Sequence, residues 1–189
     1  EGDRLGLLLF GTEPYIQAPL TFDLTTVRTL LNESGIGMAG RATAIGDAIG
    51  LAVKRLRDRP QEQRVVILLT DGANTAGEIT PDKATEIAEA TGVRIYTIGV
   101  GSKDGGGRGG LLGMFRRRGS DLDEPMLRDI AAQTEARYFR AADTKALQQV
   151  YDTIDALEKT TAEASIFVHR EERFQPFAIV GLLCVLLST

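Results

Sequence analysis

The sequence predicts an α/β fold: a doubly wound, mostly parallel sheet with helices on both faces. Two observations favour it. In the second half of the chain, apolar runs alternate with helical stripes, and such strand–helix–strand connections make neighbouring strands parallel. The run Val65 to Leu69 contains no polar residue, which is typical of a strand covered on both faces. The 189 residues are enough for one such domain and a tail.

The first elements are predicted to be two strands. Leu5 to Phe10 is an apolar run that ends at Gly11. Tyr15 to Phe22 follows as a neighbouring strand, and its Pro19 favours an edge position. Asp23 is then the expected N-cap of a helix.

The clearest helix is predicted from Ala44 to Leu56, because its apolar residues recur at the helical period. These residues are Ile45, Ala48, Ile49, Ala52, Val53 and Leu56. Thr43 stands directly before them, where an N-cap hydroxyl belongs.

The later elements repeat the strand–helix pattern. Thr80 and Pro81 predict the N-cap and first residue of a helix, and Gly92 ends it. The elements expected after it are a buried strand at 93–100, a helix after Asp123, a short strand at 136–139, a helix after Asp143, and a short strand or extended connector at 165–168.

Residues 101–120 are rich in glycine and include Arg116-Arg117-Arg118. Such a long segment is either a disordered surface loop or a contact site for a partner or lipid headgroups. It lacks the Gly-x-x-x-x-Gly-Lys-Ser/Thr pattern of a phosphate-binding loop.

Composition excludes several function classes. The net charge of −4 and the pI near 5.2 disfavour a nucleic-acid binder. A single cysteine, Cys184, permits no internal disulfide. A single histidine, His169, excludes a His-rich metal site and disfavours a Ser-His-Asp triad.

The C-terminal residues are strongly apolar. Residues 177–187 have no polar side chain apart from Cys184, but a membrane span needs about 20 residues. A buried helix is therefore an alternative. We expect the start of a transmembrane helix over 174–189, after a domain over 1–160 and a connector over 161–173. Both chain ends look cut, so we expect a fragment of a longer protein.

Asp71 and Thr43 are the candidate site residues. Asp71 follows a buried strand, at the sheet edge where α/β proteins bind ligands. It is either a cap of its own turn or a ligand-binding carboxylate. Thr43 precedes a helix and can face the same edge. A hydroxyl and a carboxylate are hard oxygen ligands of the kind that Mg²⁺ takes, although two ligands do not complete a site.

The segments Gly40-Arg41-Ala42-Thr43-Ala44-Ile45-Gly46-Asp47-Ala48-Ile49 and Leu68-Leu69-Thr70-Asp71-Gly72 resemble two motifs of the von Willebrand factor A domain. The resemblance implies a metal-ion-dependent adhesion site, with Thr43 as a direct hydroxyl ligand of Mg²⁺ and Asp71 bound through water. The family's first motif, Asp-x-Ser-x-Ser, is absent from this sequence. The resemblance places its strand in the middle of the sheet, and we expect it before Glu1.

The match is nearest to the bacterial membrane-anchored, aerotolerance-type (Bat) members. Leu122-Asp123-Glu124, Tyr138-Phe139-Arg140-Ala141 and the segment 154–160 are similar to theirs in order and spacing. The resemblance implies a domain tethered to the bacterial inner membrane and facing its extracytoplasmic side.

The leading hypothesis is a non-enzymatic, membrane-tethered module that binds a protein partner, with the partner supplying a carboxylate to the metal. One alternative is an α/β enzyme that uses Asp71 for phosphoryl transfer or hydrolysis. Another is a subunit that couples an ATPase to a partner. No nucleic-acid partner is expected.

Overall fold

The structure, a computed structural model, describes residues 4–100 and 122–166, with 160–166 described by their backbone alone. The chain divides into two compact units, residues 1–154 and 155–189. The sheets, the core and the candidate site all belong to the first unit.

The elements follow the predicted order. They are β1 (Leu5–Leu9), β2 (Tyr15–Thr21), α1 (Leu24–Glu33), α2 (Ile45–Leu56), the short 3-10 helix η1 (Gln61–Gln63), β3 (Val65–Thr70), α3 (Pro81–Ala90), β4 (Arg94–Val100), α4 (Glu124–Gln133), β5 (Tyr138–Ala141) and α5 (Thr144–Ile166).

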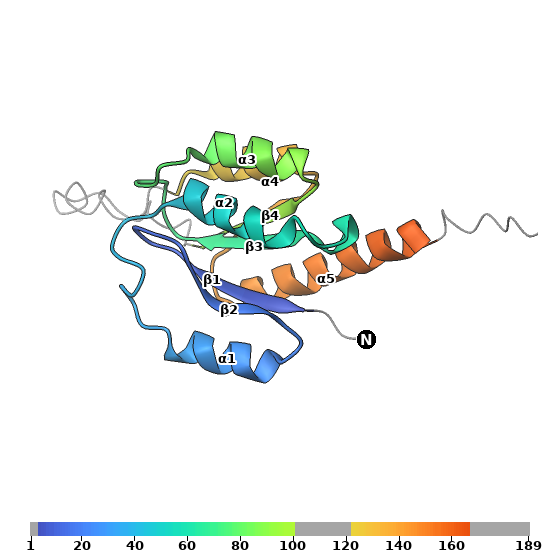
Figure 1. The fold of residues 1–189 in the computed structure, drawn as a ribbon, viewed down its shortest axis with the longest axis horizontal. Helices are drawn as coiled ribbons and strands as arrows, with labels where there is room; N and C mark the ends of the chain where they lie inside the picture. The colour runs from blue at the N-terminus through green and yellow to red at the C-terminus, as the bar shows by residue number, and fades with distance from the viewer. Residues whose placement is uncertain (1–3, 101–121, 167–189) are drawn as a thin grey trace, which may run out of the picture. The chain divides into compact units, whose positions relative to one another are not determined.

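The predicted parallel sheet is confirmed. β3, β4 and β5 form a parallel three-stranded sheet in that order, and β1 and β2 form a separate antiparallel pair (Figure 1). The β3–β4 register runs from Val65 opposite Arg94 to Thr70 opposite Gly99. All three parallel strands therefore end at one edge of their sheet, and Asp71 follows β3 at that edge.

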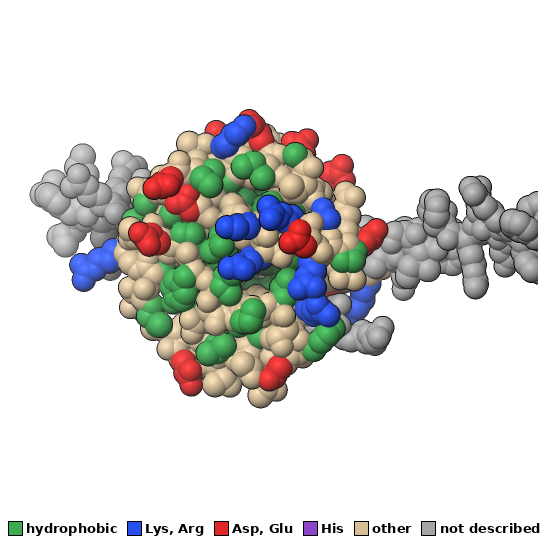
Figure 2. All heavy atoms as spheres, in the orientation of Figure 1, with side chains coloured by type: hydrophobic (Ala, Val, Ile, Leu, Met, Phe, Trp, Pro, Cys, Tyr) green, Lys and Arg blue, Asp and Glu red, His purple; other side chains and the backbone are tan. Residues whose placement is uncertain are grey.

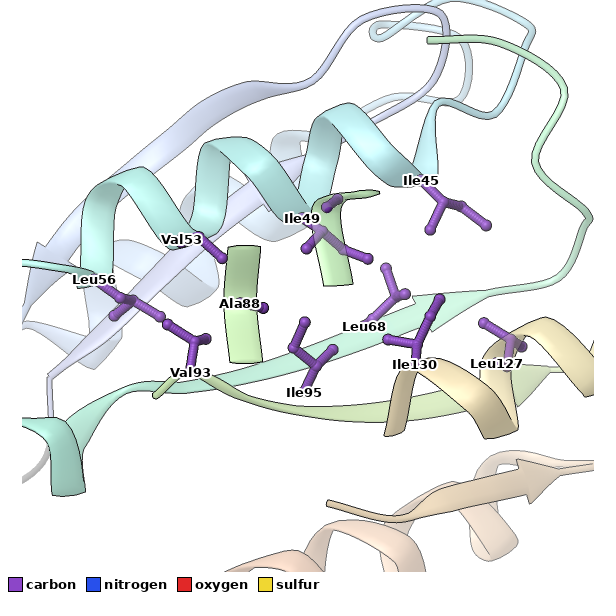
Figure 3. Close-up of a cluster of buried hydrophobic side chains, with 11 residues drawn as sticks. Ile45, Ile49, Val53, Leu56, Leu68, Ala88, Val93, Ile95, Leu127 and Ile130 are labelled. Atoms are coloured by element: carbon purple, nitrogen blue, oxygen red, sulfur yellow. The ribbon is translucent and has the colours of Figure 1, made fainter. Parts of the chain in front are cut away.

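The apolar stripe of α2 packs onto the parallel sheet. Ile45, Ile49 and Val53 point from α2 toward β3 and β4 (Figure 3). Leu127 and Ile130 reach the same cluster from α4. In Figure 1, α2, α3 and α4 lie on one side of the strands, with α1 and the beginning of α5 on the other. Helices therefore occupy both faces, as predicted.

β1 and β3 each have one paired edge and one open edge among the described residues. Side chains alternate across a strand, so Leu68 is buried at 5% exposure, whereas Ile67 and Leu69 on the opposite face are each 39% exposed. The prediction that this strand is covered on both faces is therefore wrong for the described residues. No described element covers the Ile67 face well enough to bury it.

Two elements differ from the prediction by more than one residue. β5 begins at Tyr138, not at 136, because residues 135 and 136 close α4: the Ala136 N–H donates to Ala131, and Glu135 has φ of 56°. α5 continues through Ile166, so the segment expected as a strand or connector begins within a helix. No glycine or proline interrupts 144–166, which explains why the helix continues.

Two predictions fall on other parts of the chain. The loop at 101–120 and the membrane segment at 174–189 lie outside the described residues. Within the described residues, no helix is both long and apolar enough to cross a membrane.

We predict that residues 1–173 expressed alone are aggregated or molten. The open edges of β1 and β3, and the exposed Ile67 and Leu69, favour self-association against a net stability of only about 5–15 kcal/mol. Size-exclusion chromatography and thermal unfolding measure this. A monomeric peak with a cooperative transition would contradict the prediction.

Two variants of this fragment test whether the exposed side chains of β3, and not its core side chain, cause the aggregation. Ile67→Thr with Leu69→Thr should raise its soluble fraction, because both side chains are partly exposed. Leu68→Thr should lower it, because Leu68 lies in the core.

Candidate metal site

The structure brings the two predicted site residues together. Asp71 is exposed directly after β3, and Thr43 is half-buried two residues before α2. A Cβ atom built on Gly72 would lie 3.9 Å from Thr43 Oγ1. The Thr43 hydroxyl therefore lies beside the Asp71-Gly72 corner.

The Asp71 carboxylate does not cap its own turn. Thr70 caps the turn instead. Its Oγ1 accepts a hydrogen bond from the Gly72 N–H at 3.3 Å and lies within donating distance, 3.2 Å, of the Gly72 carbonyl oxygen. No described residue hydrogen-bonds the Asp71 carboxylate. Of the two interpretations of Asp71, the cap is therefore wrong, and the carboxylate remains available to a ligand.

Thr43 is not the N-cap of α2, contrary to the prediction. Ala44 occupies that position and has no capping side chain. Instead, Asn74 Oδ1 accepts the hydrogen bond from the Ile45 N–H at 2.8 Å. A side chain 29 residues away thus replaces the local cap, and no described residue hydrogen-bonds the Thr43 hydroxyl.

The backbone of Thr43 is held by residues 71–80, which we call the 71–80 loop. The Thr43 N–H donates to Thr75 Oγ1 at 2.9 Å. The Thr43 carbonyl accepts from the N–H groups of Thr75 at 2.9 Å and Ala76 at 3.3 Å. The position of the Thr43 side chain therefore depends on the loop that also contains Asp71.

The segment around Thr43 is also hydrogen-bonded to the residues that follow β1. The Ala44 N–H donates to the Gly11 carbonyl at 2.8 Å, and the Thr12 N–H donates to the Ala39 carbonyl at 2.7 Å. Thr43 consequently lies between the end of β1 and the loop after β3, at the carboxyl ends of both strands.

Asp47, in the first turn of α2, makes a further contact with the loop. Its Oδ1 accepts from the Ile79 N–H at 2.7 Å, and its Oδ2 accepts from the Glu78 N–H at 3.0 Å. Gly77 has φ of +111°, a conformation that favours glycine. A Cβ atom on Gly46 would collide with the Ile79 carbonyl oxygen. Both glycines therefore allow α2 and the loop to approach closely.

Sequence reasoning missed the roles of Asp47, Asn74 and Thr75. Asn and Thr after Asp-Gly are ordinary turn residues, and an acid in the first turn of a helix is favoured there in any case. The chain offers no local signal that these side chains bond backbone groups 29–32 residues away.

The donor set fits a hard divalent cation. Thr43 Oγ1 and the Asp71 carboxylate are hard oxygen donors to which no described residue hydrogen-bonds, and Mg²⁺ binds such groups while retaining several waters. Among the described residues, no three His, Cys, Asp or Glu side chains gather into a cluster that could hold a metal. Any further ligands must therefore be of another kind or come from elsewhere.

The surface carries both signs of charge. The face in Figure 2 has Lys and Arg side chains near its middle and Asp and Glu mainly around its edge, with hydrophobic side chains between them. This face is not the continuous basic surface that nucleic-acid binders present.

A family model decides the assignment. The model of the von Willebrand factor type A domain matches residues 1–153. The chain belongs to this family. The resemblance inferred from the motifs around Thr43 and Asp71 is thereby confirmed.

Two curated relatives are bacterial proteins. A protein of Borreliella burgdorferi is 26% identical over 194 residues, which cover 99% of this chain and 56% of that protein. A protein of Nocardia farcinica is 26% identical over 215 residues, covering 98% of this chain and 58% of the relative. The chain thus spans little more than half the length of these relatives.

Two solved structures connect the domain with the aerotolerance-type members. An aerotolerance-related membrane protein from Bacteroides fragilis is 26% identical, with a TM-score of 0.61, covering 81% of this chain and 79% of that one. BatB from Bacteroides thetaiotaomicron is 25% identical, with a TM-score of 0.62, covering 85% and 81%.

We predict that Asn74, and not Thr43, stabilises the start of α2. Asn74→Ala leaves the buried Ile45 N–H without its acceptor and should lower the free energy of unfolding by about 1–3 kcal/mol. Thr43→Val should change it by less than about 0.5 kcal/mol. Chemical denaturation of the full-length protein in a chelator measures both. Equal losses would restore Thr43 as a cap.

Proposed function

We propose that this domain is a non-enzymatic, membrane-tethered protein-binding module with a metal-ion-dependent adhesion-type site. The observation that supports it best is the pairing at one sheet edge. The Thr43 hydroxyl lies beside the Asp71-Gly72 corner, and no described residue hydrogen-bonds either the hydroxyl or the Asp71 carboxylate. Both side chains can therefore contact a ligand bound beside the Asp71-Gly72 corner.

In this proposal Thr43 ligates the ion directly and Asp71 binds through water. Further oxygen ligands come from a segment that fills the open edges of β1 and β3. The resemblance assigns such a segment the Asp-x-Ser-x-Ser pattern. Its position between β1 and β3 would place these ligands beside Thr43, which the end of β1 and the 71–80 loop already hold.

The partner is a protein that presents a carboxylate. The bound Mg²⁺ supplies a positive charge with an open coordination position. Thr43 and Asp71 would hold the ion at the carboxyl edge of the strands, where the Asp71 side chain is exposed.

We also propose a bacterial inner-membrane location with the domain on the extracytoplasmic side, and a role in an aerotolerance or stress complex. Two observations support membrane association: the apolar residues 177–187, and the similar membrane protein from Bacteroides fragilis. The side of the membrane and the process follow from the resemblance to the Bat members alone.

If the metal site is correct, two substitutions in the full-length protein should each weaken Mg²⁺ binding, for different reasons. Thr43→Val removes a direct oxygen ligand and keeps the β-branched shape, and Asp71→Asn removes only the negative charge. Asp71→Asn should weaken Mg²⁺ binding about 10–100-fold, and Thr43→Val at least as much. Isothermal calorimetry measures the affinity, and partner binding should fall with it.

Thr25→Val on α1 and Asp82→Asn on α3 are matched controls, because both residues are exposed on other elements. The controls should keep wild-type affinity. Wild-type Mg²⁺ affinity in Thr43→Val or Asp71→Asn would remove that residue from the site.

The membrane proposal predicts that the full-length protein stays in the membrane fraction after high-salt and alkaline washes. A transmembrane segment resists both treatments, since its apolar side chains lie in the hydrocarbon core. Fractionation and immunoblotting measure the distribution. Release by either wash would favour a buried or surface helix for 174–189.

A further inference from the structure

We propose that Asp47 is the positioning residue of the metal site: its carboxylate holds the 71–80 loop against α2 and thereby sets Asp71 relative to Thr43. This inference rests on the proposed metal site. We assign Asp47 a positioning role and not a ligand role, because both its oxygens accept hydrogen bonds from the loop, whereas no described residue hydrogen-bonds the Asp71 carboxylate.

Residues 71–80 connect β3 to α3 and contain no helix or strand. A segment of ten residues without regular structure needs contacts elsewhere to keep one conformation. Asp71 is its first residue, and Thr43, whose backbone bonds Thr75 and Ala76 in the middle of the loop, lies beside the Asp71-Gly72 corner.

Thr43 and the start of α2 contact the loop at three points. Thr43 bonds Thr75 and Ala76, the Ile45 N–H bonds Asn74, and Asp47 bonds Glu78 and Ile79. Only the last of these three contacts involves a charged group. Hydrogen bonds to a carboxylate are about twice as strong as neutral ones, so Asp47 provides the strongest point of this interface.

Close packing makes the loop sensitive to the Asp47 contact. A Cβ atom on Gly77 would lie 3.1 Å from Asp47 Oδ2, and the Ile79 carbonyl closely approaches Gly46. Ile79 also packs against the core cluster beneath α2. Without the carboxylate, the Glu78 and Ile79 N–H groups lose their acceptor, and we expect the loop to shift.

The contact differs from an ordinary helix cap. A capping carboxylate accepts N–H groups of its own helix, as Asp23 does from Thr26 at the start of α1. Asp47 accepts N–H groups 31 and 32 residues away. Its effect therefore reaches a second segment, and that segment contains a proposed ligand.

The test compares wild type, Asp47→Asn and Asp47→Ala in the full-length protein. Calorimetry measures Mg²⁺ affinity, and amide hydrogen exchange in a chelator measures the loop. We expect affinity to fall about tenfold or more in Asp47→Ala, with Asp47→Asn between it and wild type, because asparagine keeps one acceptor oxygen. The Thr75 and Ala76 amides, which Asp47 does not contact, should exchange faster in both variants.

Asp23→Asn is the matched control, since it changes a carboxylate that accepts backbone N–H groups far from the site. It should leave both measurements at wild-type values. A purely structural role for Asp47 would lower the melting temperature without moving the Mg²⁺ affinity, and this result would overturn the proposal. If Asp47→Ala does not fold, the Asp47→Asn affinity decides.

The two proposals fail in different ways. If wild type binds no Mg²⁺, the metal site itself is wrong, and the role of Asp47 in it falls too. If wild type binds Mg²⁺ and both Asp47 variants bind it equally well, the metal site stands and the positioning role alone is wrong.

Discussion

The contact between the start of α2 and the 71–80 loop determines the geometry of the candidate site. Backbone groups of Thr43 and Ile45 are satisfied by Thr75 and Asn74, and Asp47 holds the far end of the loop in return. Local capping is replaced by bonds between segments about 30 residues apart. As a result, no described residue hydrogen-bonds the Thr43 hydroxyl or the Asp71 carboxylate, and both lie at the same corner.

The second constraint is the open strand edge that each of the two sheets presents. β1 and β3 each have an open edge among the described residues, and the face with Ile67 and Leu69 is partly exposed. Thr43 lies where the ends of these two strands approach α2. A segment that fills the gap would therefore both bury the open edges and reach the metal site, so stability and ligand binding are expected to depend on the same segment.

Much of the fold could be predicted because its signals are local. The α2 stripe, the parallel pairing of the later strands and the caps at Thr80 and Asp123 follow from the strand–helix alternation, periodicity and helix-start residues. Asp71 at the end of β3 was predictable for the same reason. The cap of α2 was not, because the residue that provides it lies in a loop 29 residues away. Nor could periodicity reveal that Ile67 and Leu69 are exposed, since an apolar run looks alike whether one face or both are covered.

Anomalous diffraction from crystals of the full-length protein grown with Mn²⁺ tests the central claim most directly. Manganese replaces magnesium at oxygen-rich sites and can be located by its anomalous signal. The account predicts a peak within coordination distance of Thr43 Oγ1 and one water away from the Asp71 carboxylate, with the Asp47 contacts to Glu78 and Ile79 intact. An ordered site with no peak between Thr43 and Asp71 would contradict it.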